Sequence, residues 1–82
     1  MWIKSQDKKR LLEVKYFAII NTNVEAVFGD YSSTTLGKYS TEEKAMKVLD
    51  EIERFVNDLE YYKTLRHTLD NYVYQLPQDE EV

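Results

Sequence analysis

A capped amphipathic helix in the second half of the chain restricts the fold more than any other feature. Ser40-Thr41-Glu42-Glu43 matches the capping-box pattern, in which the serine hydroxyl accepts from the Glu43 N–H and Glu43 reaches back to the Ser40 N–H. The sequence therefore predicts a helix over 41–60 with one apolar stripe, which other elements must cover. The stripe recurs at steps of three and four residues and consists of Ala45, Val48, Leu49, Ile52, Phe55, Val56 and Leu59.

The end of this helix is left open by the sequence. Tyr62, Leu65 and Leu69 keep the helical spacing, and neither Gly nor Pro interrupts the run. Residues 61–71 are therefore interpreted either as helix reaching at least Arg66, continuous or as a second helix, or as a loop.

Short apolar segments before and after the helix in the sequence are expected to form strands that pack against its apolar stripe. An Asn-Thr-Asn turn between 16–20 and 24–28 predicts a β-hairpin. Both faces of 16–20 are apolar, so we expect this strand to be central or covered on both sides. Gly37, inside a later strand, indicates a bulge or a close backbone approach. The remaining strands are expected at 2–4 (an edge strand), 11–14, 34–39 and 72–76.

This order of elements predicts an α+β fold. We expect a small antiparallel sheet of about four to six strands, covered on one face by the long helix, with a final C-terminal strand. For a chain of 82 residues we expect a single domain over 1–77, followed by an acidic, flexible tail at 78–82.

The ionisable and sulfur-containing residues limit how so small a domain can gain stability. No cysteine is present and only one histidine, so disulfides, thiolate metal sites and His-rich metal sites are excluded. Oligomerisation is the remaining aid, and a homodimer is the default expectation. The absence of cysteine also fits the cytosol.

The N-terminal residues become charged too early for a signal peptide, and no stretch approaches the roughly 20 apolar residues of a membrane span. We therefore expect a soluble, cytoplasmic protein without a membrane partner.

No constellation of residues predicts catalysis. His67 has Arg66 beside it, which does not favour an imidazolium, and no general-acid or general-base partner is evident. No serine lies in a nucleophile elbow. The carboxylates at 42–43 and 79–81 lack the alternating ligand spacing of a calcium loop. We therefore expect a non-enzymatic protein with no catalytic, cofactor-binding or metal-binding residues.

A basic run near the N-terminus raises nucleic-acid binding as the alternative function. Lys8, Lys9 and Arg10 lie close in sequence to Trp2 and Tyr16, and aromatic rings beside basic residues can stack single-stranded bases. The net charge of −4 and the missing RNP consensus argue against it.

Exposed aromatic side chains favour a protein-interaction domain as the preferred function. Tyr72 and Tyr74 share one face of the terminal strand, and together with Trp2 they are the predicted contact residues. The competing interpretation is that the two tyrosines pack beneath the helix stripe.

Three blocks of the chain are distinctive: MWIKSQDK at 1–8, LGKYSTEEKA at 36–45 with VLDEI at 48–52, and YQLPQD at 74–79. They reach both ends of the chain and resemble a family of small uncharacterised proteins of Gram-positive bacteria and their phages or prophages. The resemblance implies a complete stand-alone protein. It transfers no activity and no site residues, and it implies variation over 15–33 and 57–71.

Overall fold

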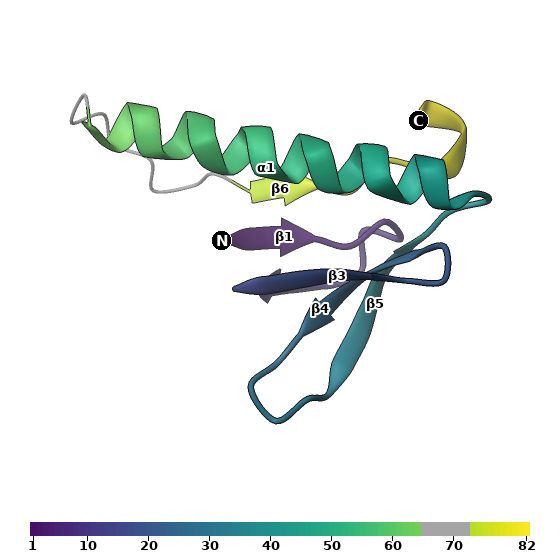
Figure 1. Ribbon diagram of the computed structural model, residues 1–82. Helices are drawn as coiled ribbons and strands as arrows, with labels where there is room; N and C mark the ends of the chain where they lie inside the picture. The colour runs from purple at the N-terminus through teal and green to yellow at the C-terminus, as the bar shows by residue number, and fades with distance from the viewer. Residues whose placement is uncertain (65–72) are drawn as a thin grey trace.

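The computed structural model describes residues 1–64 and 73–82, with side chains over 1–58 and 73–82. The described part confirms the α+β class, because six strands and one long helix form it (Figure 1). The elements are β1 (Trp2–Lys4), β2 (Leu11–Glu13), β3 (Tyr16–Ile20), β4 (Asn23–Val27), β5 (Ser33–Lys38), α1 (Glu42–Thr64), β6 (Val73–Gln75) and a 3-10 helix η1 (Asp79–Glu81).

The strands form two three-stranded sheets rather than one. In the first sheet the order is β2-β1-β6, with β1 antiparallel to β2 and parallel to β6. The sequence places β1 at an edge, but it is central because the last strand of the chain pairs with its free side. That parallel pair, Ile3 opposite Tyr74, is the departure from an all-antiparallel sheet.

The second sheet is an antiparallel meander in the order β3-β4-β5. The predicted hairpin is confirmed: β3 and β4 pair from Tyr16–Val27 to Ile20–Asn23 around a two-residue turn. Asn21 has a φ of 59° there, a left-handed conformation that Asn tolerates better than most residues.

Gly37 fulfils both expectations for its position on β5. Val24 pairs with Gly37 while Glu25 pairs with Thr35, so Leu36 is an extra residue in β5 and forms a bulge. A Cβ on Gly37 would lie 2.8 Å from Leu76 Cδ2, so the glycine is required for space.

The helix prediction is confirmed, and α1 continues through Thr64. Whether helix extends to Arg66 and beyond falls outside the described residues. α1 lies along one side of both sheets (Figure 1). The core beneath it gathers buried apolar residues from strands, helix and loops: Ile3, Val14, Val24, Ala26, Leu36, Tyr39, Ala45, Val48, Ile52 and Leu76.

The predicted capping box is corrected by one residue. The Thr41 hydroxyl accepts from the Lys44 N–H at 3.1 Å, so Thr41 is the N-cap. The Ser40 N–H donates instead to Asp79 Oδ1 at 2.8 Å. The hydroxyls of Ser40 and Thr41 are adjacent, and either could cap this helix. The Asp79 carboxylate accepts from the Ser40 N–H, which Glu43 was expected to bind.

The acidic tail, expected to be flexible, forms η1 and contacts the start of α1. Lys44 Nζ donates to the Asp79 carbonyl at 2.9 Å and lies 3.6 Å from Asp79 Oδ2. The Ser40 N–H, and then the nearby Lys44 charge, hold the pKa of Asp79 below its usual value. The tail therefore fixes the N-terminal end of the helix.

The expectation for β3 is wrong. β3 is an edge strand, and its two end residues, Tyr16 and Ile20, are 66% and 43% exposed. Only the Phe17 and Ile19 face packs against the core. A sheet of three strands with one helix leaves one face uncovered, so a strand that is apolar on both faces must present one of them outward.

Candidate protein-interaction surface

The most polar cluster of the molecule is the loop between β1 and β2, which we call the Ser5–Arg10 loop (residues 5–10). Ser5 is fully buried, and its hydroxyl donates to Asp7 Oδ1 at 2.5 Å while accepting from the Arg10 N–H at 3.2 Å. This hydroxyl, followed by the Lys9 N–H, lowers the pKa of Asp7. The carboxylate is thus committed to holding the loop.

Gln6 ties the Ser5–Arg10 loop to β5. Its N–H donates to the Leu36 carbonyl at 2.8 Å, and its side-chain oxygen accepts from the Lys38 N–H at 2.9 Å. Its amide nitrogen donates to the carbonyls of Lys38 and Pro77 at 3.0 and 3.3 Å. Gln6 therefore occupies part of the outer edge of β5 as a further strand would.

The C-terminal segment completes this hub. Gln75 Nε2 donates to the Ser5 carbonyl at 2.8 Å, and Gln78 Nε2 donates to the Gln6 carbonyl at 2.6 Å. The Tyr39 hydroxyl donates to the Pro77 carbonyl at 2.8 Å. Residues from the three segments 1–8, 36–45 and 74–79 meet here, and their polar groups hold the fold together.

The structure places the basic run and Trp2 at opposite ends of β1. All three cations of the run are exposed, but the Arg10 guanidinium donates to Thr34 Oγ1 at 2.9 Å and to the Thr35 carbonyl, so it is engaged with β5. Trp2 lies at the opposite end of β1 from the Ser5–Arg10 loop. Bases stacked on Trp2 would therefore lie away from these lysines.

The residues predicted for protein contact divide three ways. Trp2 is 47% exposed on β1. Tyr74 is half-buried beneath α1: its ring centroid lies 5.5 Å from that of Phe55, and its hydroxyl donates to Glu51 Oε2 at 2.9 Å. Burial, and then Glu51, raise the pKa of Tyr74. Tyr74 thus follows the competing interpretation, while Tyr72 and His67 lie outside the described residues.

Exposed apolar side chains gather instead around β3 and the β4–β5 loop. Tyr16 and Ile20 project from β3, and Phe28 and Tyr31 lie in the loop, which extends away from α1 (Figure 1). Tyr31 is 95% exposed and has a φ of 67°, a conformation that a bulky side chain rarely adopts. A strained and fully exposed aromatic residue at a loop tip is a candidate contact residue.

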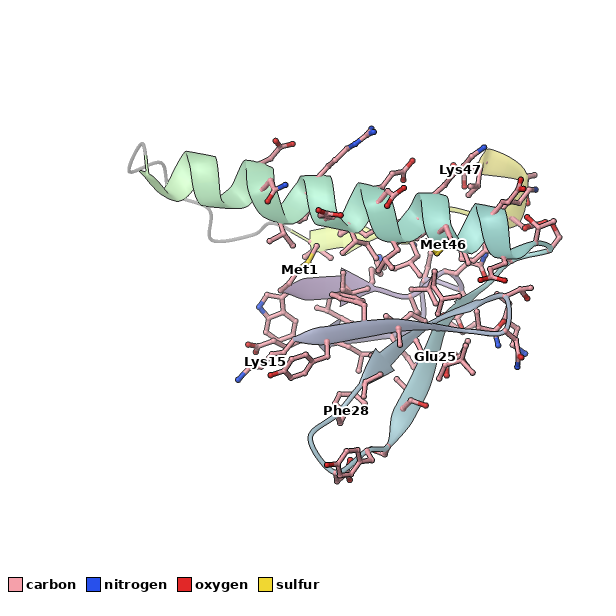
Figure 2. The ribbon with its side chains drawn as sticks, viewed as in Figure 1. Met1, Lys15, Glu25, Phe28, Met46 and Lys47 are labelled. Carbon is pink, nitrogen blue, oxygen red and sulfur yellow. The ribbon has the colours of Figure 1, made fainter. Side chains whose placement is uncertain are left out.

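A shallow hollow of about 580 Å³ lies between β3 and the start of this loop. Tyr16, Val27 and Phe28 form its apolar wall, and Glu13 and Lys15 border it. Figure 2 shows Phe28 below β3, on the side away from α1.

A second depression, which we call the α1–β3 groove, lies between the helix and β3 and has a volume of about 360 Å³. Its floor is apolar, and its ionisable residues are Lys15 and Glu53, one of each sign. The apolar lining residues are Tyr16, Phe17, Leu49, Ile52 and Val56. The edge of β3 is thus bordered by two depressions that share Lys15 and Tyr16.

The outer edge of β3 is unpaired within residues 1–64 and 73–82. The strand contains no proline, bulge or charged residue, the devices by which proteins usually protect an edge from pairing. β5, the other edge of this sheet, is covered by Gln6 and Arg10. The edge of β3, with the α1–β3 groove and the exposed side chains of Tyr16 and Ile20, is the candidate surface.

Glu25 is an unexpected buried carboxylate in the middle strand of this sheet. It is 7% exposed, pairs with Ala18 and Thr35, and its Oε2 has no hydrogen-bond partner in the part of the chain that the structure describes. An unpaired buried oxygen is costly, so Glu25 destabilises the sheet at the strand next to β3.

Sequence reasoning missed this surface although the signal was present. Both faces of β3 are apolar in the sequence, and the chain is short. A domain with one helix cannot cover both faces, so this strand could have been predicted to expose Tyr16 and Ile20. Tyr31 follows Gly29-Asp30 in a turn, which already places it at a loop tip.

Comparison of the chain with protein-family models, with curated proteins and with solved structures gives no match. Among the described residues, no helix combines the length and apolarity needed to cross a membrane. The same residues bring no three metal-ligating side chains together. The function is therefore argued from the geometry of the candidate surface.

Proposed function

We propose that this chain is a small, non-enzymatic, cytoplasmic protein-interaction domain that binds through the candidate surface. The observation that carries the proposal is the unprotected, entirely apolar edge of β3. An added strand would gain main-chain hydrogen bonds to this edge and place alternate side chains in the α1–β3 groove.

The groove supports this mode of binding because of its composition. Phe17, Leu49 and Val56 offer apolar area, and the polar residues of the lining are Lys15, Glu53 and Asn57. A partner strand with apolar residues at alternate positions would match it.

The pattern of structural hydrogen bonds supports the same assignment by elimination. The conspicuous polar residues of the loops, including Ser5, Gln6, Asp7 and Asp79, have their hydrogen-bonding groups engaged within the fold. Four of the nine large apolar side chains that are exposed among the described residues lie in β3 or in the β4–β5 loop.

The test is affinity capture with three purified proteins, followed by mass spectrometry. The wild type is compared with Ile20→Lys, which places a charge at the edge of β3, and with Leu11→Lys, which makes the same kind of change at an exposed apolar residue of β2. We expect the same partner with the wild type and Leu11→Lys and its loss with Ile20→Lys. Equal retention by all three proteins would refute the assignment of the surface.

Nucleic-acid binding is checked with the same proteins. Fluorescence anisotropy of a single-stranded oligonucleotide at low salt is expected to stay flat, because Arg10 is engaged with β5 and the net charge is −4. Salt-sensitive binding that disappears on Lys8→Ala/Lys9→Ala would favour the alternative function.

A further inference from the structure

We propose that the occupant of the candidate surface is a second copy of this chain, joined by antiparallel pairing of β3 with β3 about a two-fold axis at Ala18. This inference rests on the proposed function, because it assumes that the edge of β3 is an interface, and it names the partner.

The hydrogen-bonding direction of each β3 residue follows from the turn that ends the strand. A two-residue turn makes Ile20 and Asn23 the hydrogen-bonded pair next to it. Alternation along the ladder then directs the N–H and C=O of Ala18 towards β4, and those of Phe17 and Ile19 outward. The two residues whose groups point outward are symmetric about Ala18, as a two-fold pairing needs.

The side chains of β3 are complementary to themselves in this register. Phe17 lies opposite the second copy's Ile19, and Tyr16 lies opposite the second copy's Ile20, while the small Ala18 meets its own copy at the axis. Aromatic residues opposite β-branched ones are favourable cross-strand pairs, and no charges of like sign face each other.

The groove beside β3 fits a second copy in charge and in position. A two-fold axis perpendicular to the sheet places both α1 helices on the same face of a continuous six-stranded sheet. The second copy's Ile19 then lies on the face of the α1–β3 groove, whose lining includes Phe17, Leu49 and Val56. Lys15 and Glu53 bring charges that sum to zero in each copy, so the two grooves meet without net repulsion.

Other strand edges in the described structure are poorer candidates. The outer edge of β5 carries Gln6 and Arg10. β2 and β6, the edges of the other sheet, have three residues each, and short edge strands pair weakly. β3 has five residues, all apolar or aromatic.

A charge-reversal pair of variants tests both the dimer and its register. Tyr16→Lys/Ile20→Lys sets lysine opposite lysine at both ends of the paired strands, whereas Tyr16→Glu/Ile20→Lys sets glutamate opposite lysine at the same places. Both positions are exposed in the single chain, so neither variant removes a core contact.

By sedimentation equilibrium, the wild type is expected to form a concentration-dependent dimer. The double-lysine variant should raise the dimer dissociation constant at least about tenfold, and the glutamate–lysine variant should restore most of the affinity. A wild type that stays monomeric to about millimolar concentration, the weakest affinity expected of a specific dimer, would overturn the proposal. Equal weakening by both variants would overturn the register at Ala18.

A cross-link gives an independent measurement. The chain has no cysteine, so Ala18→Cys offers a single thiol, and a directly opposed pair in an antiparallel ladder has the Cα separation that a disulfide requires. We expect rapid cross-linking of Ala18→Cys on mild oxidation and slow cross-linking of Leu11→Cys. Equal rates would contradict the axis at Ala18.

The two proposals fail differently. If the wild type is monomeric yet Ile20→Lys still abolishes capture of a foreign protein, the surface is an interface but the second copy is the wrong occupant. If the dimer forms as described and Ile20→Lys leaves a foreign partner bound, the edge of β3 serves assembly and the foreign partner uses another surface.

Discussion

Replacing Gly37 by alanine is expected to destabilise the fold through lack of space. The new Cβ would lie 2.8 Å from Leu76 Cδ2 and 3.0 Å from both Cε2 and Oη of Tyr39. Carbon atoms in favourable contact are about 3.5–4.0 Å apart, so each of these contacts is too short. Neither neighbour has room to withdraw, since Leu76 is fully buried and the Tyr39 hydroxyl is bonded to the Pro77 carbonyl at 2.8 Å.

The expected magnitude follows from two opposing effects. Overpacking a well-filled core costs about 1–3 kcal/mol. Loss of glycine's freedom in the unfolded chain returns about 0.4–1 kcal/mol. With central values of about 2 and about 0.7 kcal/mol, the net loss in the free energy of unfolding is about 1.3 kcal/mol, which lowers the melting temperature of a domain of this size by roughly 5–10 °C.

Urea denaturation followed by circular dichroism measures this loss, with Gly29→Ala as the matched control. No atom lies within 4 Å of a Cβ built on Gly29, and its φ is not positive, so Gly29→Ala should be neutral or slightly stabilising. Adding Leu76→Ala to Gly37→Ala removes the closest contact, and the double variant should be more stable than the sum of the single losses predicts. If Gly37→Ala unfolds within about 0.5 kcal/mol of the wild type, the usual scatter of surface substitutions, the steric argument is refuted.

Four further predictions concern stability. Tyr31→Gly should raise the free energy of unfolding by about 0.5–1 kcal/mol, because it relieves a left-handed backbone and removes almost no packing; no gain in a thermal melt would contradict the strain. Thr41→Ala should lower the free energy of unfolding by about 1 kcal/mol, and Ser40→Ala should lower it less. The reverse order in urea titrations would assign the N-cap to Ser40 instead of Thr41. Glu25→Gln should stabilise by about 1 kcal/mol, since a neutral amide replaces an unpaired buried carboxylate oxygen, and a loss of that size would show that the charge is paired. The pKa of Asp79 is lowered in the folded state from 3.8, so its contribution to stability is present above about pH 4 and is lost as the pH falls below that value. Asp79→Asn should therefore flatten the acid limb of a curve of unfolding free energy against pH. An unchanged limb would count against the contact between the tail and α1.

The elements that the sequence predicted well depend on local patterns. The stripe from Ala45 to Val56 determines α1, and the Asn21 turn determines the β3–β4 hairpin, because each signal lies within a few turns of helix or one hairpin. Gly37 was also recognised, since a glycine inside an apolar strand usually marks a bulge or a close backbone approach.

The features that the sequence did not predict depend on partners far along the chain. Gln75 and Ser5 are 70 residues apart in sequence and are hydrogen-bonded, and Asp79 takes the N–H of Ser40 across 39 residues. No local pattern contains such a pair. The first sheet likewise depends on the pairing of β1 with β6, and the shift of the cap accompanies the Asp79–Ser40 contact.

The candidate surface was missed for a different reason. Apolar residues on both faces of β3 are compatible with a buried strand and with an edge strand. Only the number of helices and strands that can pack on its two faces distinguishes these alternatives. Tyr74 shows the converse, because its aromatic ring in a terminal strand looked available but packs on Phe55.

The parallel pairing of β1 with β6 joins the first strand of the chain to the last. Ile3 and Tyr74 are neighbours in space, so β1 stays without one of its partners until residues 73–75 have been made. Contacts of such long sequence separation must overcome loop-closure entropy before they contribute, and they slow folding. During synthesis the order β2-β1-β6 can form only after residues 73–75 are available, whereas all three strands of the second sheet have been made by residue 38.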